Sequence, residues 1–350
     1  MTTTIPRLAS LSTAVPPHVL GQPEVTIRAR HLFAERAGAA LDRLMPVFAN
    51  AGIERRYSSV PIDWYEKPHG WTDRNALFLE NAVNLLEETS RDALALAGLT
   101  PGDIDAVVVA STTGVATPSL DAMLINRLGL KPEVRRLPIF GLGCAGGVIG
   151  LARAADLARI HPTSRVLFAV VELCALNFRK NDTSKSNVVA TALFGDGAAA
   201  AVLSCRGDGP ALGPAGEHTW PNSLDIMGWD VVEDGMKALF SRDIPALVRG
   251  HMRQVAGDFL ARHGLSLENI RHFVCHPGGA KVLTALEEAF HLAEGALADA
   301  RGVLRDYGNM SAATVMFVLE RMLRQGATGR MLVTALGPGF TAGFQLIDAG

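Results

Sequence analysis

The sequence predicts a layered α/β protein made of two similar halves. Helical periodicity alternates along the chain with strand-like runs that are apolar throughout. The helical segments are 76–97, 146–160 and 311–324, and the strand-like runs are 106–110, 166–171, 198–203 and 331–335. Uninterrupted apolar strands between helices are typical of α/β folds whose sheets are buried on both faces.

An internal repeat predicts the duplication. The segment Ala97–Ile104 resembles His263–Ile270, and each precedes an apolar strand. The same spacing places Gly143–Ala145 opposite Asn309–Ser311. Two halves with the same order of elements indicate a duplicated unit related by a pseudo-twofold axis.

The boundary between the halves is expected near residue 206. Glycine, proline and aspartate accumulate over 206–221 with little periodicity, which is typical of a connection. We therefore predict an N-terminal half at 1–205 and a C-terminal half at 206–350.

Composition limits the classes of function. The chain has 350 residues, 48% of them apolar, and a net charge of −2, which favours a large core and argues against nucleic acid as a partner. Its beginning resembles neither a signal nor a transit peptide, and no apolar run is long enough to cross a membrane. We expect a soluble, cytoplasmic protein without a membrane partner. The four cysteines lack metal-type spacing, so we predict no metal site.

Three segments far apart in the chain suggest one acyl-transfer site. They are Gly141–Gly147 around Cys144, Cys275–Gly279 around His276, and Tyr307–Ser311 around Asn309. The helix that begins after Cys144 favours a thiolate through its free amides and dipole, and a neighbouring imidazolium would lower the thiol pKa further. His276 follows an apolar strand, where α/β sites form. The amide of Asn309 can donate to an oxyanion without repelling it.

Each residue also has an ordinary structural interpretation. Cys144 could be a small buried residue at a helix contact, His276 a buried residue with its partners satisfied, and Asn309 a helix cap. The occurrence of all three types in glycine-rich segments favours the catalytic interpretation.

These motifs resemble the type III polyketide synthases, the chalcone synthase superfamily within the thiolase fold. The resemblance runs from Ile53–Tyr57 through Ala192–Ala198 to Gly337–Phe340. Ketoacyl synthases of fatty-acid initiation follow the histidine with Gln-Ala-Asn, whereas this chain has Pro277–Gly279. The resemblance implies a thiolase-like fold, with duplicated βαβ-rich halves in αβαβα layers, and a homodimer.

The resemblance also implies roles for individual residues. Cys144 would carry the acyl starter as a thioester, while His276 and Asn309 would bind the malonyl-CoA carbonyl and stabilise the enolate formed on decarboxylation. Phe194 would separate the CoA tunnel from the cavity, and Thr117 would reach into the neighbouring subunit's cavity. The other substrate-binding positions would be Thr112, Thr113, Cys174, Asn177, Ala238, Ser311, Gly337, Pro338 and Gly339.

Two departures from the plant pattern bear on the substrate. Ala238 stands where plant members carry a second phenylalanine at the cavity wall. Arg43 matches one of the basic residues that hold CoA, but Pro46 and Asn50 replace others, so an acyl carrier protein is an alternative carrier. No cofactor is expected besides the acyl-CoA and malonyl-CoA substrates.

The sequence is compatible with more than one kind of starter. The segments Ala116–Ser119, Met227–Asp230 and Phe240–Pro245 resemble bacterial members that make alkylpyrones or alkylresorcinols from fatty acyl starters. We therefore predict a fatty acyl starter extended with malonyl-CoA. The alternatives are an aromatic or short starter, a ketoacyl synthase of fatty-acid initiation, and an inactive thiolase-fold partner subunit.

Overall fold

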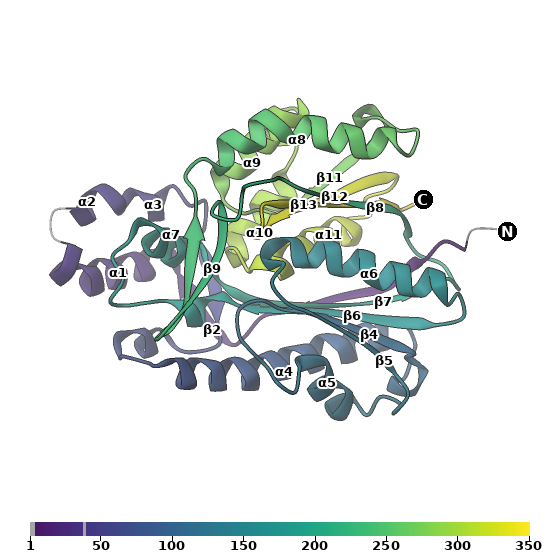
Figure 1. Ribbon diagram of the computed structural model, residues 1–350, viewed down its shortest axis with the longest axis horizontal. Helices are drawn as coiled ribbons and strands as arrows, with labels where there is room; N and C mark the ends of the chain where they lie inside the picture. Colours follow the sequence, from purple (N-terminus) through teal and green to yellow (C-terminus); the bar gives the residue numbers. More distant parts are fainter. Residues whose placement is uncertain (1–3, 38–39) are drawn as a thin grey trace.

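The computed structural model describes residues 4–37 and 40–350, which form five layers (Figure 1). The strands are β1 (Arg7–Ala14), β2 (His18–Gly21), β3 (Arg55–Ser58), β4 (Ala106–Ala110), β5 (Arg135–Ile139), β6 (Arg165–Leu173), β7 (Asp196–Ser204), β8 (Ala211–Thr219), β9 (Met227–Val232), β10 (Gly235–Phe240), β11 (His272–Cys275), β12 (Arg330–Gly337) and β13 (Thr341–Asp348).

The helices fill the outer and central layers. They are α1 (Gln22–Ala37), α2 (Ala40–Leu44), α3 (Pro46–Ala49), α4 (Trp71–Leu96), α5 (Leu120–Leu128), α6 (Gly146–Ile160), α7 (Lys185–Leu193), α8 (Ile244–Ala261), α9 (Ala280–Phe290), α10 (Ala298–Tyr307) and α11 (Thr314–Arg324). Short 3₁₀ helices are η1 (Ile62–Glu66), η2 (Pro101–Asp103), η3 (Gly143–Ala145), η4 (Cys174–Asn177), η5 (Leu267–Asn269) and η6 (Ser311–Ala313).

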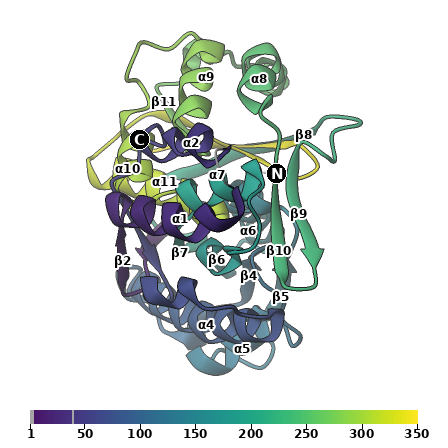
Figure 2. The same cartoon turned by 90° about the vertical axis from the view of Figure 1, so that its left-hand side faces the viewer.

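The layers follow the predicted αβαβα arrangement. Figure 2 shows α4 and α5 on one outer face and α8 and α9 on the other, with the strands of the two halves between them. Helices α6 and α11 lie between the two groups of strands and contact strands of both halves. The predicted thiolase-like α/β fold class is confirmed.

The strand order confirms the duplication. Nine of the described strands form one sheet, in the order β11-β12-β13-β8-β1-β7-β6-β4-β5, and β2 with β3 and β9 with β10 form two small separate sheets. In the first half β4 is parallel to β6, and β7 and β1 follow antiparallel. In the second half β11 is parallel to β12, and β13 and β8 follow antiparallel. A single pairing, Arg7 with Ala211, joins the halves.

The repeated segments adopt the same turn. Thr100 and Asp103 form a capping box around η2, and Ser266 and Asn269 form the same box around η5. Each turn leads directly into the first strand of its half, β4 or β11. A Thr or Ser followed three residues later by Asp or Asn therefore carries the repeat that the sequence indicates.

The two central helices begin alike, but not at the residues that the sequence places opposite each other. Gly143 and Ser311 each open the 3₁₀ turn before a central helix, and both have φ of +46°. Gly143 therefore corresponds to Ser311 rather than to Asn309. The correspondence shifts by two residues because the turn begins 39 residues after the start of β11 (311 − 272) but 37 residues after the start of β4 (143 − 106).

Close packing between the central helices requires glycine. A Cβ on Gly147 would lie 2.2 Å from the carbonyl oxygen of Ala312. This contact brings the start of α6 against η6, and so brings the segments of Cys144 and Asn309 together.

The expected connection at 206–221 contains a nine-residue strand instead. Strand β8 pairs with β13, and the pairing is irregular between Gln345 and Ile347, opposite Gly213 and Pro214. A bulge accommodates proline because proline cannot donate to the ladder. The division that we propose at 205/206 falls between β7 and β8.

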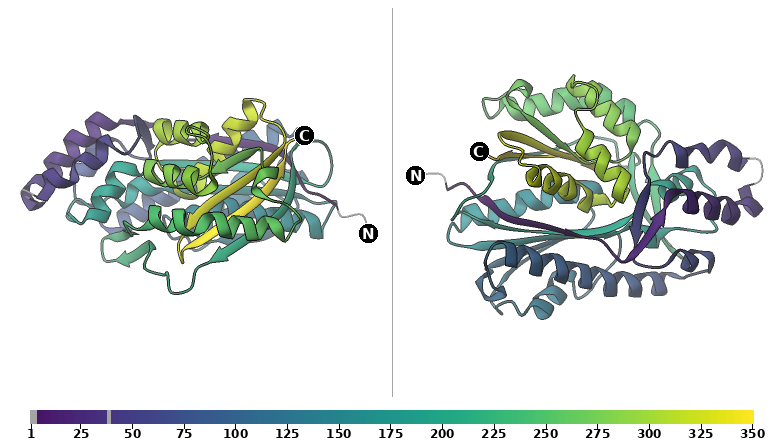
Figure 3. Two further views of the ribbon diagram at one scale, coloured as in Figure 1. Left: turned by 90° about the horizontal axis from the view of Figure 1, so that it is seen from above. Right: turned by 180° about the vertical axis from the view of Figure 1, so that it is seen from behind.

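One end of the molecule collects the elements that surround the candidate site. Helices α1, α2, α3 and α7 and the β9–β10 hairpin gather at the end away from the marked chain termini (Figure 1). Figure 3 shows β1 running through the fold toward this end. No helix within the described residues is long and apolar enough to span a bilayer.

Candidate active site

Cys144, His276 and Asn309 line one pocket. Cys144 comes from η3, His276 directly follows β11, and Asn309 precedes η6. We call this hollow the Cys144 pocket; its other lining side chains are mostly apolar, including Met227, Phe240, Ile244, Met252, Val282 and Leu286. The arrangement places a thiol, an imidazole and an amide together in apolar surroundings.

His276 is buried and available for proton transfer. The backbone N–H of His276 donates to the backbone carbonyl of Thr334 at 2.9 Å, which fixes the backbone beside β12. Neither ring nitrogen has a hydrogen-bond partner among the described residues. Burial lowers the pKa of His276 to about 3, so the imidazole is neutral at pH 7. A neutral imidazole offers one donor and one acceptor to a substrate.

Asn309 combines a structural contact with a free donor. Its Oδ1 accepts from the N–H of Ser311 at 2.8 Å, which fixes the orientation of the amide. Its Nδ2 donates one hydrogen to the carbonyl of Gly278 at 3.2 Å. The second Nδ2 hydrogen has no acceptor among the described residues and is available to an oxyanion. The helix-cap interpretation and the donor interpretation are therefore compatible.

The loop that carries Cys144 is set by close packing. Gly143 donates its N–H to Thr112 Oγ1 at 3.0 Å, and a Cβ on Gly143 would lie 2.5 Å from Pro338. A Cβ on Gly337 would lie 2.3 Å from the carbonyl oxygen of Leu142. The predicted segment of Gly337, Pro338 and Gly339 thus packs against the Cys144 loop, which explains its small residues.

The pKa of Cys144 moves opposite to the sequence expectation. The pKa of the thiol is raised to about 12, mainly by burial and also by the Glu172 carboxyl, while a hydrogen bond with Ser311 opposes both. The neutral His276 supplies no positive charge to offset this. Desolvation outweighs the helix amides. Without a bound substrate, the Cys144 thiol is therefore protonated at neutral pH.

Glu172 is the site residue that the sequence interpretation missed. Its Oε2 accepts from the N–H groups of Thr112 and Thr113, both at 3.1 Å, and from Thr113 Oγ1 at 2.8 Å. Its Oε1 accepts from Ser311 Oγ at 3.4 Å. Three predicted substrate-binding residues thus surround a buried carboxyl beside Cys144. The only acid in the otherwise apolar run Val166–Leu173 was the available signal.

A second hollow, the Phe194 cavity, lies behind an aromatic partition. Its free volume is about 70 Å³. The ring of Phe194 stacks on that of Trp229, with ring centroids 5.5 Å apart. Its centroid lies 5.6 Å from that of Phe240. Phe240 also lines the Cys144 pocket. The predicted residues Cys174, Asn177, Phe194 and Ala238 all line the cavity.

A third hollow, the cationic groove, adjoins the Cys144 pocket. The two share Phe240, Ile244, Gly278 and Val282. Arg43 lines the groove as predicted, and so do Lys185, Arg242 and Lys281. These cations come from α2, α7, the β10–α8 connection and α9. Because they are far apart in the sequence, no local motif predicts the groove.

Thr117 lies on an exposed loop, in a cis peptide bond with Pro118. Its predicted role toward a neighbouring subunit stays a prediction.

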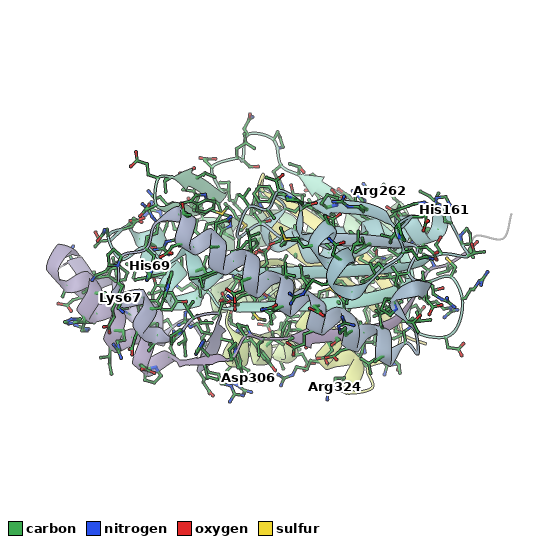
Figure 4. The ribbon with its side chains drawn as sticks, turned by 90° about the horizontal axis from the view of Figure 1, so that it is seen from below. Lys67, His69, His161, Arg262, Asp306 and Arg324 are labelled. Atoms are coloured by element: carbon green, nitrogen blue, oxygen red, sulfur yellow. The ribbon has the colours of Figure 1, made fainter. Side chains whose placement is uncertain are left out.

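Figure 4 labels Lys67 and His69 near the α1 end and His161, just after α6, toward the other end. Among the described residues, no group of three or more His, Cys, Asp and Glu side chains is placed to hold a metal ion.

Comparison with known proteins decides the family. Residues 7–207 match the N-terminal domain, and residues 212–347 the C-terminal domain, of the family described as chalcone and stilbene synthases. The chain belongs to the chalcone and stilbene synthase family. It is a type III polyketide synthase, an acyltransferase that catalyses decarboxylative condensation with malonyl-CoA.

Relatives of this synthase match it over nearly its whole length. A 1,3,6,8-tetrahydroxynaphthalene synthase of Streptomyces peucetius subsp. caesius is 40% identical and covers 97% of the chain and 92% of its own length. A putative chalcone synthase of Bacillus subtilis is 36% identical over 96% of both. The crystal structure of 1,3,6,8-tetrahydroxynaphthalene synthase from Streptomyces coelicolor has a TM-score of 0.93 at 30% identity and covers 98% of this chain and 99% of its own.

The buried carboxyl of the synthase predicts a pH-dependent stability. Burial raises the pKa of Glu172 from 4.5 to about 7. The folded state thus holds this proton more tightly than the unfolded state, and stability falls as the pH rises through 7. Glu172→Gln removes the ionisation. The free energy of unfolding of Glu172→Gln relative to wild type should therefore rise by up to about 3 kcal/mol between pH 4 and pH 8.

Denaturant unfolding of both proteins at pH 4, 6 and 8 measures this difference. Glu268→Gln, an exposed acid on η5, is the control and should show no comparable trend. A difference for Glu172→Gln that is constant with pH would contradict the assignment.

Proposed function

We propose that this synthase loads a fatty acyl starter on Cys144 and extends it with malonyl-CoA to alkylpyrone- or alkylresorcinol-type products. The observation that carries the choice of starter is the Phe194 cavity beside Ala238. Its wall includes Leu20, Val25, Ala29, Leu32, Ile62 and Ala190, which suit an alkyl chain. Each buried methylene contributes roughly 0.8 kcal/mol, so several carbons shift selectivity strongly.

Loading is a thioester exchange. The Cys144 thiol attacks the acyl-CoA carbonyl, its proton passes through His276 to the departing CoA sulfur, and acyl-Cys144 and free CoA result. Burial lowers the pKa of His276, so its imidazole is neutral and a ring nitrogen without a hydrogen-bond partner among the described residues is open to this proton.

Chain extension uses His276 and Asn309 as hydrogen-bond donors. Malonyl-CoA loses CO₂, and the electron pair of the broken bond forms an enolate whose oxygen accepts from His276 and Asn309. The enolate carbon then attacks the acyl-Cys144 carbonyl, and the Cys144 sulfur leaves. The product is a β-ketoacyl-CoA two carbons longer, ready for another round.

The cationic groove is the proposed binding site for the carrier of both substrates. Its four cations, Arg43, Lys185, Arg242 and Lys281, suit the phosphates of CoA, and its position next to the Cys144 pocket suits a pantetheine arm. An acyl carrier protein presents the same arm. Steady-state kinetics with matched acyl-CoA and acyl-carrier-protein substrates distinguish the two.

The experiment that tests the function is a starter panel. Purified protein is incubated with radiolabelled malonyl-CoA and with acetyl-, aromatic or long saturated acyl-CoA, and the products are identified by mass. Long acyl-CoA should give the highest kcat/KM. A preference for acetyl- or aromatic acyl-CoA would reject the fatty acyl starter and leave the condensation chemistry intact.

The Ala238→Phe variant tests the cavity itself. Ala238 pairs with Trp229 across the β9–β10 hairpin, and both line the cavity, so a ring at 238 takes space from the acyl chain. Exclusion of two methylenes corresponds to a loss of about tenfold or more in kcat/KM for long acyl-CoA. Short acyl-CoA should be spared. Val231→Phe, at an exposed position of the same hairpin, is the matched control.

A second candidate is a synthase that uses a short starter. The 40% identity to the Streptomyces peucetius 1,3,6,8-tetrahydroxynaphthalene synthase favours it, because that product name contains no alkyl chain. In that case the starter panel gives a product from malonyl-CoA alone at a rate that long acyl-CoA does not increase.

We also propose a homodimer. Strand β5 is one of the two edge strands of the nine-stranded sheet, and Phe140 just after it is 61% exposed. Light scattering coupled to size-exclusion chromatography measures the mass directly, and a monomer at micromolar concentration would contradict the proposal.

A further inference from the structure

Arg56, on β3, is a buried cation that the catalytic chemistry does not use. It is 2% exposed, and no carboxylate pairs with it among the described side chains. Burial lowers its pKa to about 10, which still leaves it charged at neutral pH. A buried charge without a counterion is costly unless hydrogen bonds compensate it. The partners of Arg56 therefore indicate what it is for.

Those partners lie at the C-terminal end of α7. Arg56 Nη1 donates to the carbonyl of Thr191 at 2.6 Å and to the carbonyl of Phe194 at 3.2 Å. Its Nη2 donates to Gln22 Oε1. The last carbonyls of a helix lack intrahelical donors and carry the negative end of the dipole, so a cation is favoured there.

Gln22 completes the same cap. Its Nε2 donates to the carbonyl of Ala192 at 3.1 Å and to the carbonyl of Phe48 at 3.0 Å. Three carbonyls around the end of α7 are thus bound by two side chains from elsewhere in the chain. Gln22 lies 34 residues from Arg56 in sequence, and α7 lies more than 100 residues further on.

The capped residues are the ones that hold Asn309. The N–H of Asn309 donates to the carbonyl of Leu193 at 2.8 Å, and the N–H of Gly195 donates to the carbonyl of Asn309 at 3.0 Å. Phe194, between them, forms an isolated bridge with Asn309. The carbonyl of Phe194 is itself bound by Arg56. A displacement at the end of α7 therefore moves both the partition residue Phe194 and the oxyanion donor Asn309.

We propose that Arg56, together with Gln22, is a positioning residue that fixes Asn309 and Phe194 for malonyl-CoA decarboxylation and condensation. The inference rests on the proposed role of Asn309. Arg56 touches no reacting atom; it acts by holding the segment to which Asn309 is bonded.

Arg56→Lys is the informative variant. Lysine keeps the charge but lacks the planar fork that reaches two carbonyls and Gln22 together. Malonyl-CoA decarboxylation should fall by about 10²-fold, the effect of a small misplacement of a catalytic group. Loading of Cys144 from acetyl-CoA, followed by intact mass, should change less than about threefold, because Cys144 and His276 have no hydrogen bond to α7 and a two-carbon starter does not fill the Phe194 cavity, which Arg56 also lines. Arg55→Lys, at the adjacent exposed position of β3, is the matched control and should match wild type.

A separation of the two readouts supports the proposal, since a merely structural role would lower both in proportion to the folded fraction. Decarboxylation and loading that fall together, or that both stay normal, overturn it. If Arg56→Lys does not fold, Gln22→Met removes the second half of the cap and is judged by the same separation. Asn309→Ala is measured in parallel. Normal decarboxylation by Asn309→Ala means that the proposed function of Asn309 fails, whereas an impaired Asn309→Ala beside a normal Arg56→Lys means that only this inference fails.

Discussion

Replacing Cys144 with serine should abolish starter loading and polyketide formation, with a loss on the order of 10⁴- to 10⁶-fold in turnover. Serine keeps the shape of the side chain but removes the only group in the pocket able to form a thioester. Its hydroxyl is a weaker acid than a thiol, and the burial that already raises the pKa of Cys144 to about 12 would penalise an alkoxide more strongly. Malonyl-CoA decarboxylation should persist at a reduced rate because His276 and Asn309 are unchanged.

Intact-mass analysis with peptide mapping measures the acyl adduct. Cys205→Ser is the matched control, since Cys205 is partly buried, donates to the carbonyl of Ala158 at 3.3 Å and lies outside the Cys144 pocket. It should load and turn over like wild type. An acyl adduct that persists in Cys144→Ser and maps to Cys205 would show that the nucleophile is misassigned.

The sequence could predict the site where its constraints are local. Gly143 has a left-handed backbone and packs against Pro338, and Gly147 allows α6 to approach η6. Each of these constraints requires a glycine, which can be recognised in the sequence. The capping boxes of η2 and η5 are likewise four-residue patterns, so the duplication was recognisable from Thr100–Asp103 and Ser266–Asn269.

What depends on burial was not predictable. The thiol of Cys144 sits at a helix start, which favours ionisation, but the surrounding apolar residues and Glu172 reverse the shift, and these come from several separate elements. The three additional cations of the cationic groove and the cap that Arg56 forms on α7 are also contacts between distant segments. Strand β8 was not predicted because Pro214 and the glycines of this segment are typical of a loop, whereas the structure accommodates them in a strand with a bulge.

Replacing Asn309 with alanine should lower malonyl-CoA decarboxylation and condensation by about 10²–10³-fold, the usual cost of losing one oxyanion donor. Loading of Cys144 should suffer less, because the thiol and His276 remain. Alanine alone does not separate the two roles of this residue, however, since it also removes the Oδ1 acceptor for the N–H of Ser311. The two roles use different atoms of the amide, because Oδ1 accepts from Ser311 and Nδ2 is the donor, so a variant that changes only Nδ2 separates them.

Asn309→Asp keeps an oxygen where Oδ1 accepts from Ser311 but replaces Nδ2, which donates to Gly278, with a second oxygen. As helix caps, aspartate and asparagine are nearly equivalent. As an oxyanion donor, aspartate has no hydrogen to give when ionised, and its charge repels the enolate. Asn309→Asp should therefore be closer to wild type than Asn309→Ala in melting temperature, yet decarboxylate no faster than Asn309→Ala. An Asn309→Asp variant that decarboxylates malonyl-CoA at the wild-type rate would reduce Asn309 to a cap and leave His276 as the only donor to the enolate.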